Sequence, residues 1–202
     1  LYDERYHGES GGPNCSLGYH EKDDLDDVIN DTYTRFGSDI TLGLYGESMG
    51  GATVLMTQAT HPKLQFVISD CAFSDLSLLV RYLIKRKTHL PSWLIMPLAN
   101  IFFYLATKAT FRSISPMESV RNTSVPILLI HGTADEFIPP IHAKRLFEAC
   151  GGSKQLYLST HPAKHAETYL MNREEYEAIV RDFIASTTKS DFNQPTTEEE
   201  VK

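Results

Sequence analysis

Ile40-Thr41-Leu42-Gly43-Leu44-Tyr45-Gly46-Glu47-Ser48-Met49-Gly50-Gly51 is the stretch of this sequence that decides the fold. The apolar run at 40–45 predicts a buried strand, and residues 52–59 predict the start of a helix. Gly-x-Ser-x-Gly between a strand and a helix is typical of a nucleophile elbow, a sharp turn that exposes a serine hydroxyl. We therefore predict that Ser48 is a nucleophile held in a strained backbone conformation.

The residues around Ser48 fit the same turn. We expect the chain to approach itself so closely there that only small residues fit, which explains Gly46 and Gly50. The helix that follows directs its first N–H groups toward the serine, where the negative charge of an oxyanion would develop. Five-residue matches to this pattern also occur by chance, so its position between a strand and a helix carries the prediction.

Length and composition predict one globular domain. The chain has 202 residues, of which 42% are hydrophobic and 22% charged, and it can bury a sizeable core. Its net charge of −7 argues against a nucleic-acid partner. Cys15, Cys71 and Cys150 are odd in number and far apart, so we expect no disulfide framework and a reducing, cytoplasmic environment. No residue cluster indicates a metal or an organic cofactor, and the acidic run at 21–27 is typical of a solvated helix start.

Short apolar runs alternate with helical patterns along the chain. Further strands are expected at 65–69, 126–130 and 155–158, and helices at 21–36, 141–150 and 174–185. Continuous apolar strands separated by helices are typical of an α/β fold with a mostly parallel sheet and helices on both faces. Leu1 and Tyr2 resemble the end of one more strand. We expect residues 1–186 to form the domain and the polar tail at 187–202 to be disordered.

A long insertion at about 74–122 interrupts this alternation. Its centre, 90–105, is the most hydrophobic part of the chain. A transmembrane helix needs about 20 apolar residues, and Pro91, Pro97 and Asn100 interrupt this run. We therefore predict helices that form a lid over Ser48, and a substrate with an apolar group. Membrane contact is not expected, and interfacial contact with lipid is the alternative interpretation.

A serine nucleophile needs a base, and the base needs an acid that orients it. Catalytic groups of an open α/β sheet lie in loops at the carboxyl ends of the strands. That rule retains His131, His161 and His165 among the eight histidines. His131 directly follows its strand and His161 precedes a proline, whereas His165 lies deeper in the loop and is favoured. Asp70 and Asp135 both follow strands and both fit the chain order Ser-Asp-His, although Asp70 could instead cap a turn.

Five motifs recur along the chain in a fixed order. They are Tyr2-Asp3-Glu4-Arg5-Tyr6-His7-Gly8-Glu9-Ser10, Gly46-Glu47-Ser48-Met49-Gly50-Gly51, Ser115-Pro116, the stretch from Pro126 to Asp135, and Lys164-His165-Ala166-Glu167. This series resembles the α/β-hydrolases, and closely their bacterial serine aminopeptidase, prolyl-oligopeptidase-like and esterase branches. The resemblance implies Ser48 as nucleophile, Asp135 rather than Asp70 as acid, and His165 as base. It also implies that the Met49 N–H forms part of the oxyanion hole.

The sequence departs from this family at its start. The first three strands of the family have no counterpart, and the second oxyanion-hole donor normally follows the third of them. His7-Gly8 imitates the motif of that donor but lies in the loop after the fourth strand. We therefore expect the chain to be a partial α/β-hydrolase domain, with further residues upstream that supply the missing donor.

The resemblance and the residues together predict a serine hydrolase. Carboxylic ester hydrolysis through an acyl-enzyme on Ser48 is the leading interpretation, and no cofactor is required. A small-molecule ester or a short peptide is the expected substrate. A peptidase or aminopeptidase, an acyltransferase and a non-catalytic binding module with the same fold are the alternatives. The sequence does not indicate an oligomeric state.

Overall fold

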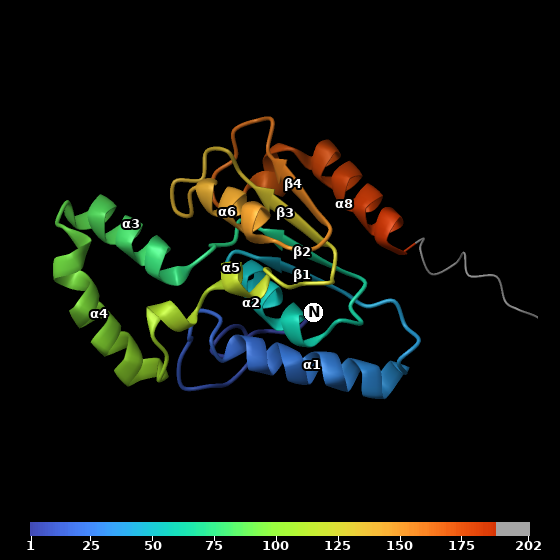
Figure 1. The fold of residues 1–202 in the computed structure, drawn as a ribbon, viewed down its shortest axis with the longest axis horizontal. Coiled ribbons are helices and arrows are strands. Elements are labelled where there is room, and N and C mark those ends of the chain that lie inside the picture. The colour runs from blue at the N-terminus through green and yellow to red at the C-terminus, as the bar shows by residue number, and fades with distance from the viewer. Residues whose placement is uncertain (189–202) are drawn as a thin grey trace, which may run out of the picture.

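Four parallel strands form the single sheet of the described structure, a computed structural model that describes residues 1–188 (Figure 1). The strands are β1 (Gly43–Glu47), β2 (Phe66–Asp70), β3 (Ile127–His131) and β4 (Lys154–Leu158), and they lie in the order β1-β2-β3-β4. All four carboxyl ends lie at one edge of the sheet, since the strands are parallel. The loops that follow the strands can therefore meet there.

Helices cover both faces of the sheet (Figure 1). The helices are α1 (Glu21–Phe36), α2 (Met49–Thr57), α3 (Leu76–Thr88), α4 (Ser92–Thr107), α5 (Pro116–Ser119), α6 (Ile141–Ala149), α7 (Thr168–Met171) and α8 (Arg173–Thr188), with short 3-10 turns at Gln58–Thr60 and Phe111–Ser113. One core cluster joins α8 to the sheet, and a second, larger cluster joins α1, α2 and α6 to the opposite face.

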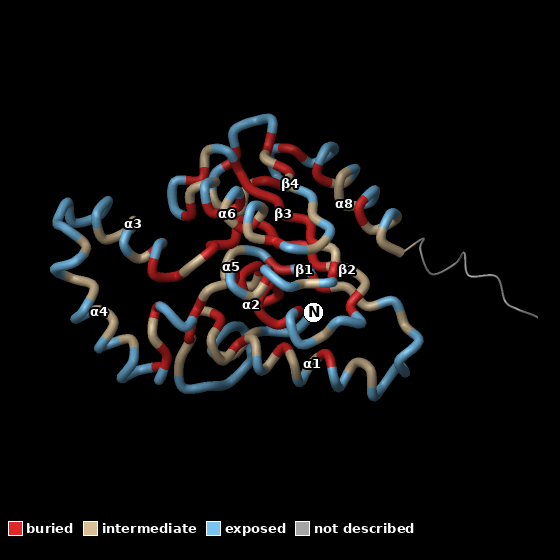
Figure 2. Tube along the Cα trace, viewed as in Figure 1, coloured by how far each residue is buried: buried red, intermediate tan, exposed pale blue. Residues whose placement is uncertain are grey.

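The strand residues alternate between these two clusters. In β3, which is buried throughout, Ile127 and Leu129 belong to the larger cluster, whereas Leu128 and Ile130 pack with α8. Burial on both faces explains why β3 is a continuous apolar run in the sequence. Figure 2 shows the strands and the inner sides of the covering helices as the buried part of the molecule.

The predicted α/β architecture is confirmed, with small changes in the bounds of its elements. β1 continues to Glu47 and α2 begins at Met49, so that Ser48 alone separates strand from helix. The expected strand end at Leu1–Tyr2 is wrong, because this segment pairs with no strand among residues 1–188 and a strand needs such a partner. α8 extends to Thr188, past the expected start of the tail, and the rest of that tail lies outside the described residues.

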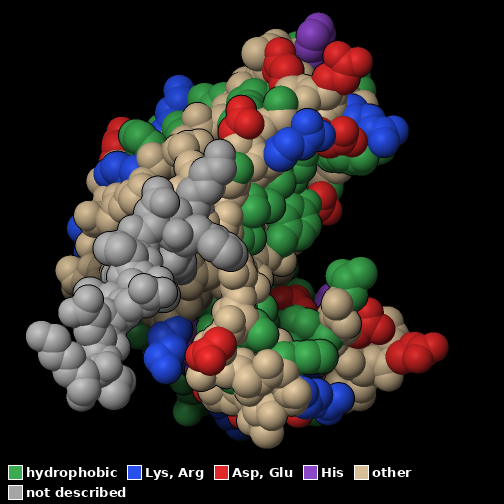
Figure 3. Space-filling model, turned by 90° about the vertical axis from the view of Figure 1, so that its right-hand side faces the viewer, with side chains coloured by type: hydrophobic (Ala, Val, Ile, Leu, Met, Phe, Trp, Pro, Cys, Tyr) green, Lys and Arg blue, Asp and Glu red, His purple; other side chains and the backbone are tan. Residues whose placement is uncertain are grey.

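The outer edge of β1 pairs with no strand in the described part of the chain. Tyr45, in the middle of this edge strand, is consequently 56% exposed. A groove of about 400 Å³ runs beside it between β1 and α1, with walls that include Leu44, Val28 and Tyr2. Figure 3 shows a face of the molecule that is deeply hollowed, with hydrophobic side chains in the hollow.

The predicted insertion consists mainly of α3 and α4, which lie beside the sheet (Figure 1). Asp75 begins α3 by accepting a hydrogen bond from the Leu78 N–H at 3.0 Å. Within residues 1–188 no single helix has the length and apolar character of a membrane span. α3 and α4 together have both but meet at a bend of 119°. Most of α4 is exposed along its length (Figure 2).

Candidate active site

Ser48 is the residue that joins β1 to α2, and its backbone is strained. Its φ of 56° and ψ of −114° lie outside the regions that a residue with a Cβ normally occupies. The Ser48 N–H donates to the Asp70 carbonyl at 2.8 Å, so the neighbouring strand β2 holds this conformation in place. The strained turn predicted from the sequence is therefore present, and it presents the Ser48 side chain at the carboxyl edge of the sheet.

The close approach of the chain at this turn involves a different pair of glycines from the expected one. A Cβ at Gly46 would lie 2.2 Å from the Gly50 carbonyl oxygen, and a Cβ at Gly51 would lie 2.9 Å from the Asp70 carbonyl oxygen. A Cβ at Gly50 would meet only a carboxylate oxygen of Glu4, at 3.9 Å. The expectation that Gly50 must be small is therefore wrong, because its Cβ position faces open space, and Gly51 is the second glycine that packing requires.

The structure brings Ser48, His165 and Asp135 into one chain of hydrogen bonds. The Ser48 Oγ lies 2.8 Å from His165 Nε2, and His165 Nδ1 lies 2.7 Å from Asp135 Oδ2. Ser48 follows β1, Asp135 follows β3, and His165 lies in the loop after β4. Residues separated by up to 117 positions in the sequence thus meet because the three strands end at the same edge.

The loops that carry Asp135 and His165 are held against each other. The Ala134 N–H donates to the Ala163 carbonyl at 2.9 Å, one position before Asp135 and two before His165. A Cβ at Gly132 would lie 2.4 Å from that same carbonyl oxygen, so only glycine allows the two loops to approach this closely. This contact sets the distance between the carboxylate and the imidazole.

Asp135 is buried, and both oxygens of its carboxylate take part in hydrogen bonds. Its Oδ1 accepts hydrogen bonds from the Phe137 and Ile138 N–H groups, both at 2.8 Å, so the loop is an Asx-type turn. Burial by itself would raise the pKa of Asp135. The hydrogen bonds from His131, His165 and the Ile138 N–H outweigh burial and hold that pKa well below its usual range. Asp135 is therefore an anion beside His165 at neutral pH.

The other candidate histidines lie elsewhere. His131 is fully buried, and its Nε2 is 2.7 Å from the Ile138 carbonyl and 3.4 Å from Asp135 Oδ2. Its contacts with Ile138 and Asp135 support the acid loop. His161 is exposed, and its backbone N–H donates to Asn172 Oδ1 at 2.9 Å. Neither histidine hydrogen-bonds to Ser48, whereas His165 does.

Asp70, the alternative acid, belongs to a separate buried cluster under α8. Its Oδ2 accepts a hydrogen bond from the Tyr176 hydroxyl at 3.1 Å, and the Tyr45 hydroxyl lies 3.2 Å from that of Tyr176. Burial, reinforced by the nearby charge of Glu47, raises the pKa of Asp70 to about 7. A carboxyl that is protonated so readily and hydrogen-bonds to no histidine is poorly suited to stabilise an imidazolium.

Met49, the expected oxyanion-hole residue, is the first residue of α2. The first N–H groups of a helix have no acceptor within it, so that of Met49 is available beside Ser48. The sequence did not indicate that Cys15 lies here as well, with its Sγ 3.4 Å from Met49 Sδ. Burial raises the pKa of the Cys15 thiol, which favours its neutral form.

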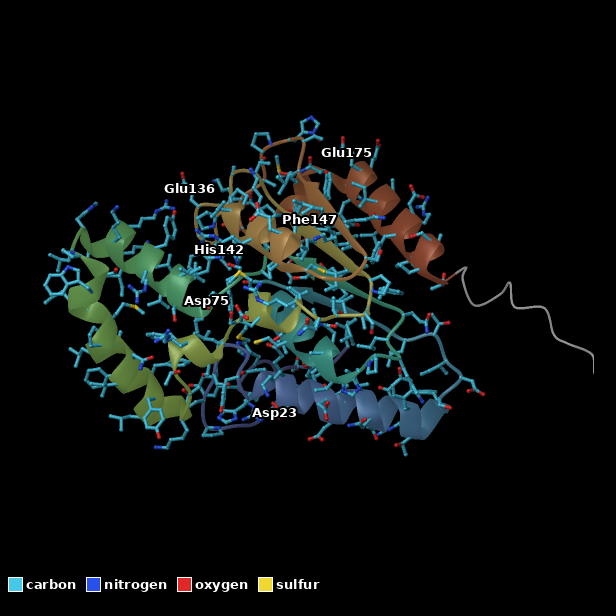
Figure 4. The ribbon with its side chains drawn as sticks, viewed as in Figure 1. Asp23, Asp75, Glu136, His142, Phe147 and Glu175 are labelled. Atoms are coloured by element: carbon cyan, nitrogen blue, oxygen red, sulfur yellow. The ribbon has the colours of Figure 1, made fainter. Side chains whose placement is uncertain are left out.

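Phe137 is a second neighbour of the site that the sequence did not reveal. Its ring lies edge to face with the His165 imidazole, with 5.0 Å between the ring centroids. A pocket of about 410 Å³ opens beside it, between the acid loop and the last turns of α3. Glu136, which lies on the side of α6 nearer to α3 (Figure 4), forms the contact with α3. Arg86 pairs with its carboxylate, and the Tyr82 hydroxyl donates to its carbonyl. The insertion thus borders the site through α3, and its role as a lid stays a prediction.

Residues 1–188 contain no group of three or more His, Cys, Asp or Glu side chains arranged to hold a metal ion. The polar groups around Ser48 are instead a hydroxyl, an imidazole, a carboxylate and a helix N-terminus. This set can move a proton from a hydroxyl to an imidazole while a fixed anion balances the resulting charge.

Sequence comparison finds relatives that match most of the chain. The model of the prolyl oligopeptidase family matches residues 30–191. The uncharacterized protein YqkD of Bacillus subtilis is 34% identical over 94% of this chain and 63% of its own length. The uncharacterized membrane protein YNL320W of Saccharomyces cerevisiae is 30% identical over 91% of this chain and 59% of its own. The chain thus spans about three fifths of the length of these relatives.

Solved structures share the fold. The esterase Pf2001 of Pyrococcus furiosus superimposes with a TM-score of 0.72 at 22% identity, over 91% of this chain and 68% of the esterase. The acylaminoacyl peptidase of Pyrococcus horikoshii gives a TM-score of 0.65 at 18% identity, over 92% of this chain and 30% of the peptidase. Their likeness supports the α/β-hydrolase architecture described above, and the family match begins within α1 and extends through α8. The chain therefore belongs to the prolyl oligopeptidase family, within the α/β-hydrolase superfamily.

Proposed function

We propose that this protein is a serine hydrolase that cleaves a carboxylic ester through an acyl-enzyme on Ser48. The observation that carries the proposal is the continuous hydrogen-bonded chain from the Ser48 hydroxyl through His165 to a buried, ionised Asp135. A structural serine has no need of a strained backbone or of an imidazole at 2.8 Å, whereas a nucleophile needs both.

The reaction begins when the Ser48 Oγ attacks the carbonyl carbon of the substrate and His165 Nε2 takes the hydroxyl proton. Asp135 keeps the proton of the neutral imidazole on Nδ1 and stabilises the imidazolium that forms. The carbonyl oxygen becomes an oxyanion beside the Met49 N–H. His165 then delivers its proton to the leaving alcohol, the C–O bond breaks, and an ester of Ser48 remains. Water repeats these steps to release the acid and restore Ser48.

An ester with an apolar acyl or aromatic group is the favoured substrate class. The ring of Phe137 next to His165 and the apolar Leu83 in the neighbouring pocket offer such a group a surface. An amide or short peptide is the second candidate, because the same three residues could cleave it and because acylaminoacyl peptidase shares the fold. A cytoplasmic location is part of the same proposal and rests on the three free cysteines.

A third candidate is a non-catalytic binding module, and its test is direct. A fluorophosphonate probe should label Ser48 covalently in the complete protein, because only an activated serine reacts with it. Ser48→Ala should lose both the labelling and the hydrolysis of short-chain aryl esters. Unlabelled wild-type protein would favour binding over catalysis, and wild-type activity in Ser48→Ala would exclude Ser48 from the reaction.

The identity of the acid is tested by a matched pair of substitutions. Asp135→Asn should lower kcat by about 10⁴-fold, because asparagine stabilises the wrong imidazole tautomer and provides no charge. Asp70→Asn removes a carboxyl that follows the neighbouring strand but does not hydrogen-bond to His165, and it should change kcat by less than about threefold. Rates of aryl ester hydrolysis across the pH range would separate the two variants, and a larger loss in Asp70→Asn would reverse the assignment.

A further inference from the structure

α4 has two apolar faces, and only one of them is covered by the described part of the chain. Met96, Ala99 and Phe103 pack against the core, and the Phe103 ring stacks on Phe111 with 4.7 Å between centroids. The opposite side carries large apolar side chains that face solvent. We call this side the outer face of α4, and it consists of Trp93, Leu94, Leu98, Ile101, Phe102 and Leu105.

The outer face is large and continuous. Its members recur at helical spacing along the 16 residues of α4, which include no charged side chain. Trp93 is 71% exposed, Phe102 63% and Leu105 60%. A helix that is apolar on all sides is normally buried, and a contiguous apolar patch of this kind normally marks an interaction site. The described residues leave α4 at the margin of the molecule, where a second surface can reach it (Figure 1).

The charge around the outer face differs from that of the rest of the chain. Residues 76–117 include six basic side chains and no acidic one, whereas the other residues carry 13 basic and 26 acidic side chains. Lys85 and Lys87, both exposed, lie in the last turn of α3 just before the bend into α4. Lys108 follows the other end of α4, and its Nζ lies 5.8 Å from the centroid of the Tyr104 ring. Basic residues therefore flank the outer face at both ends.

We propose that the outer face of α4 binds an anionic lipid surface, with the helix lying in the plane of the interface. An apolar helix face with aromatic residues at the water boundary and flanking lysines is the pattern that such interfaces favour. The side chains of Trp93 and Phe102 insert toward the lipid acyl chains. The anionic headgroups contact Lys85, Lys87 and Lys108. The acidic remainder of the chain is repelled by the same headgroups, which orients the molecule with α4 toward the lipid.

A second copy of this chain fits the outer face less well. A two-fold contact between identical faces would bring two copies of the flanking lysines Lys85, Lys87 and Lys108 close together. Protein interfaces also carry hydrogen bonds at regular intervals. In α4, the polar Asn100 points inward, where its Oδ1 accepts the Phe111 N–H at 2.9 Å. The charge pattern thus selects lipid as the occupant.

Trp93 allows a direct test, because it is the only tryptophan of the 202-residue chain. The complete protein is mixed with vesicles of phosphatidylcholine and phosphatidylglycerol in about equal parts, and separately with pure phosphatidylcholine vesicles. We expect a blue shift of Trp93 emission and quenching by brominated acyl chains with the anionic vesicles, both absent in Trp93→Phe. No shift with anionic vesicles, or equal affinity for both vesicles, would overturn the proposal.

Matched variants separate the charge contribution from general effects. Lys85→Gln with Lys87→Gln should weaken partition into anionic vesicles roughly 25-fold, since each basic residue near the surface contributes about fivefold. Lys63→Gln with Lys144→Gln removes two exposed lysines outside residues 76–117 and should change it less than about twofold. Phe102→Ser should weaken binding, whereas Leu170→Ser, at a residue that is 74% exposed in α7, should not. Equal losses in test and control variants would contradict the proposal.

Two further measurements separate lipid binding from self-association and from catalysis. A blue shift that grows with protein concentration in the absence of lipid would assign the outer face to a second copy and refute lipid binding. Ser48→Ala should bind vesicles as the wild type does, because the outer face does not depend on the reaction. Failure of the hydrolase proposal and failure of the lipid proposal are therefore distinguishable.

Discussion

At the scale of single residues, two buried carboxyl groups at the ends of neighbouring strands differ in the hydrogen bonds that they accept. Asp135 receives hydrogen bonds from two N–H groups and from His165, and these keep it ionised. Asp70 is equally buried, but among residues 1–188 it receives only the Tyr176 hydroxyl, and its Oδ1 has no hydrogen-bond partner there. Burial therefore has different consequences for the two carboxyls, because only one has enough donors to balance the loss of water.

The raised pKa of Asp70 predicts a pH-dependent gain of stability on its removal. The folded chain binds this proton up to about pH 7, whereas the unfolded chain loses it near its ordinary value of 3.8. The contribution of Asp70 to stability therefore falls as pH rises between these values. The free energy of unfolding of Asp70→Asn relative to the wild type should therefore rise between about pH 4 and about pH 7, by at most a few kcal/mol, and its Tm should exceed that of the wild type above about pH 7.

Thermal unfolding of the wild type and Asp70→Asn across this pH range measures the effect. A stability difference that stays constant with pH would contradict the prediction. His142 also titrates, but it does so in both proteins and therefore does not affect the difference in stability between them. Burial lowers the pKa of His142 to about 4, so its contribution to stability is lost as pH falls below about 6.5 in wild type and variant alike.

At the scale of elements, the sequence located the strands and helices well but misjudged the turn between β1 and α2. The apolar run ended at Tyr45, whereas pairing with β2 carries β1 on to Glu47. Strand ends and chain order favoured Ser48 and His165 but left Asp70 and Asp135 both open as the acid, and the family resemblance favoured Asp135. Cys15 and Phe137 were not predictable, since their contacts with Met49 and His165 join segments that no local pattern relates.

The glycine assignment at the start of α2 is testable by two single substitutions. Gly51→Ala should lower the free energy of unfolding by about 1–3 kcal/mol, because the new methyl group would press on the backbone of β2. Gly50→Ala should be neutral or raise it by about 0.5–1 kcal/mol, since its Cβ has room and alanine favours helix. Urea unfolding of both variants measures the difference. Equal losses would return Gly50 to the role expected from the sequence.

At the scale of the whole molecule, the outer edge of β1 stands out, since no strand of the described chain pairs with it. An unpaired edge offers N–H and C=O groups to another chain, and the apolar groove beside it increases that tendency. The sequence predicted an incomplete sheet through the missing family strands. The same resemblance predicted a free edge on the strand that carries Ser48, because the third strand of the family normally pairs with that strand.

This edge predicts self-association of the 202-residue chain. Tyr45→Lys places a charge on the edge strand and should slow the growth of light scattering at a given concentration, because lysine on an edge opposes pairing between chains. Tyr6→Lys changes a tyrosine that is 62% exposed outside the sheet, and it should have little effect. Equal scattering from both variants would show that association uses another surface.

The backbone of Ser48 has one more consequence, and it concerns descent. Glycine would relieve the φ of 56° without disturbing a neighbour, so selection for stability alone would favour glycine at this position. A protein that used the same fold without catalysis would not need a serine at this position. A serine at this position, in a backbone conformation that its own side chain disfavours, is what the proposed catalytic role of Ser48 would require.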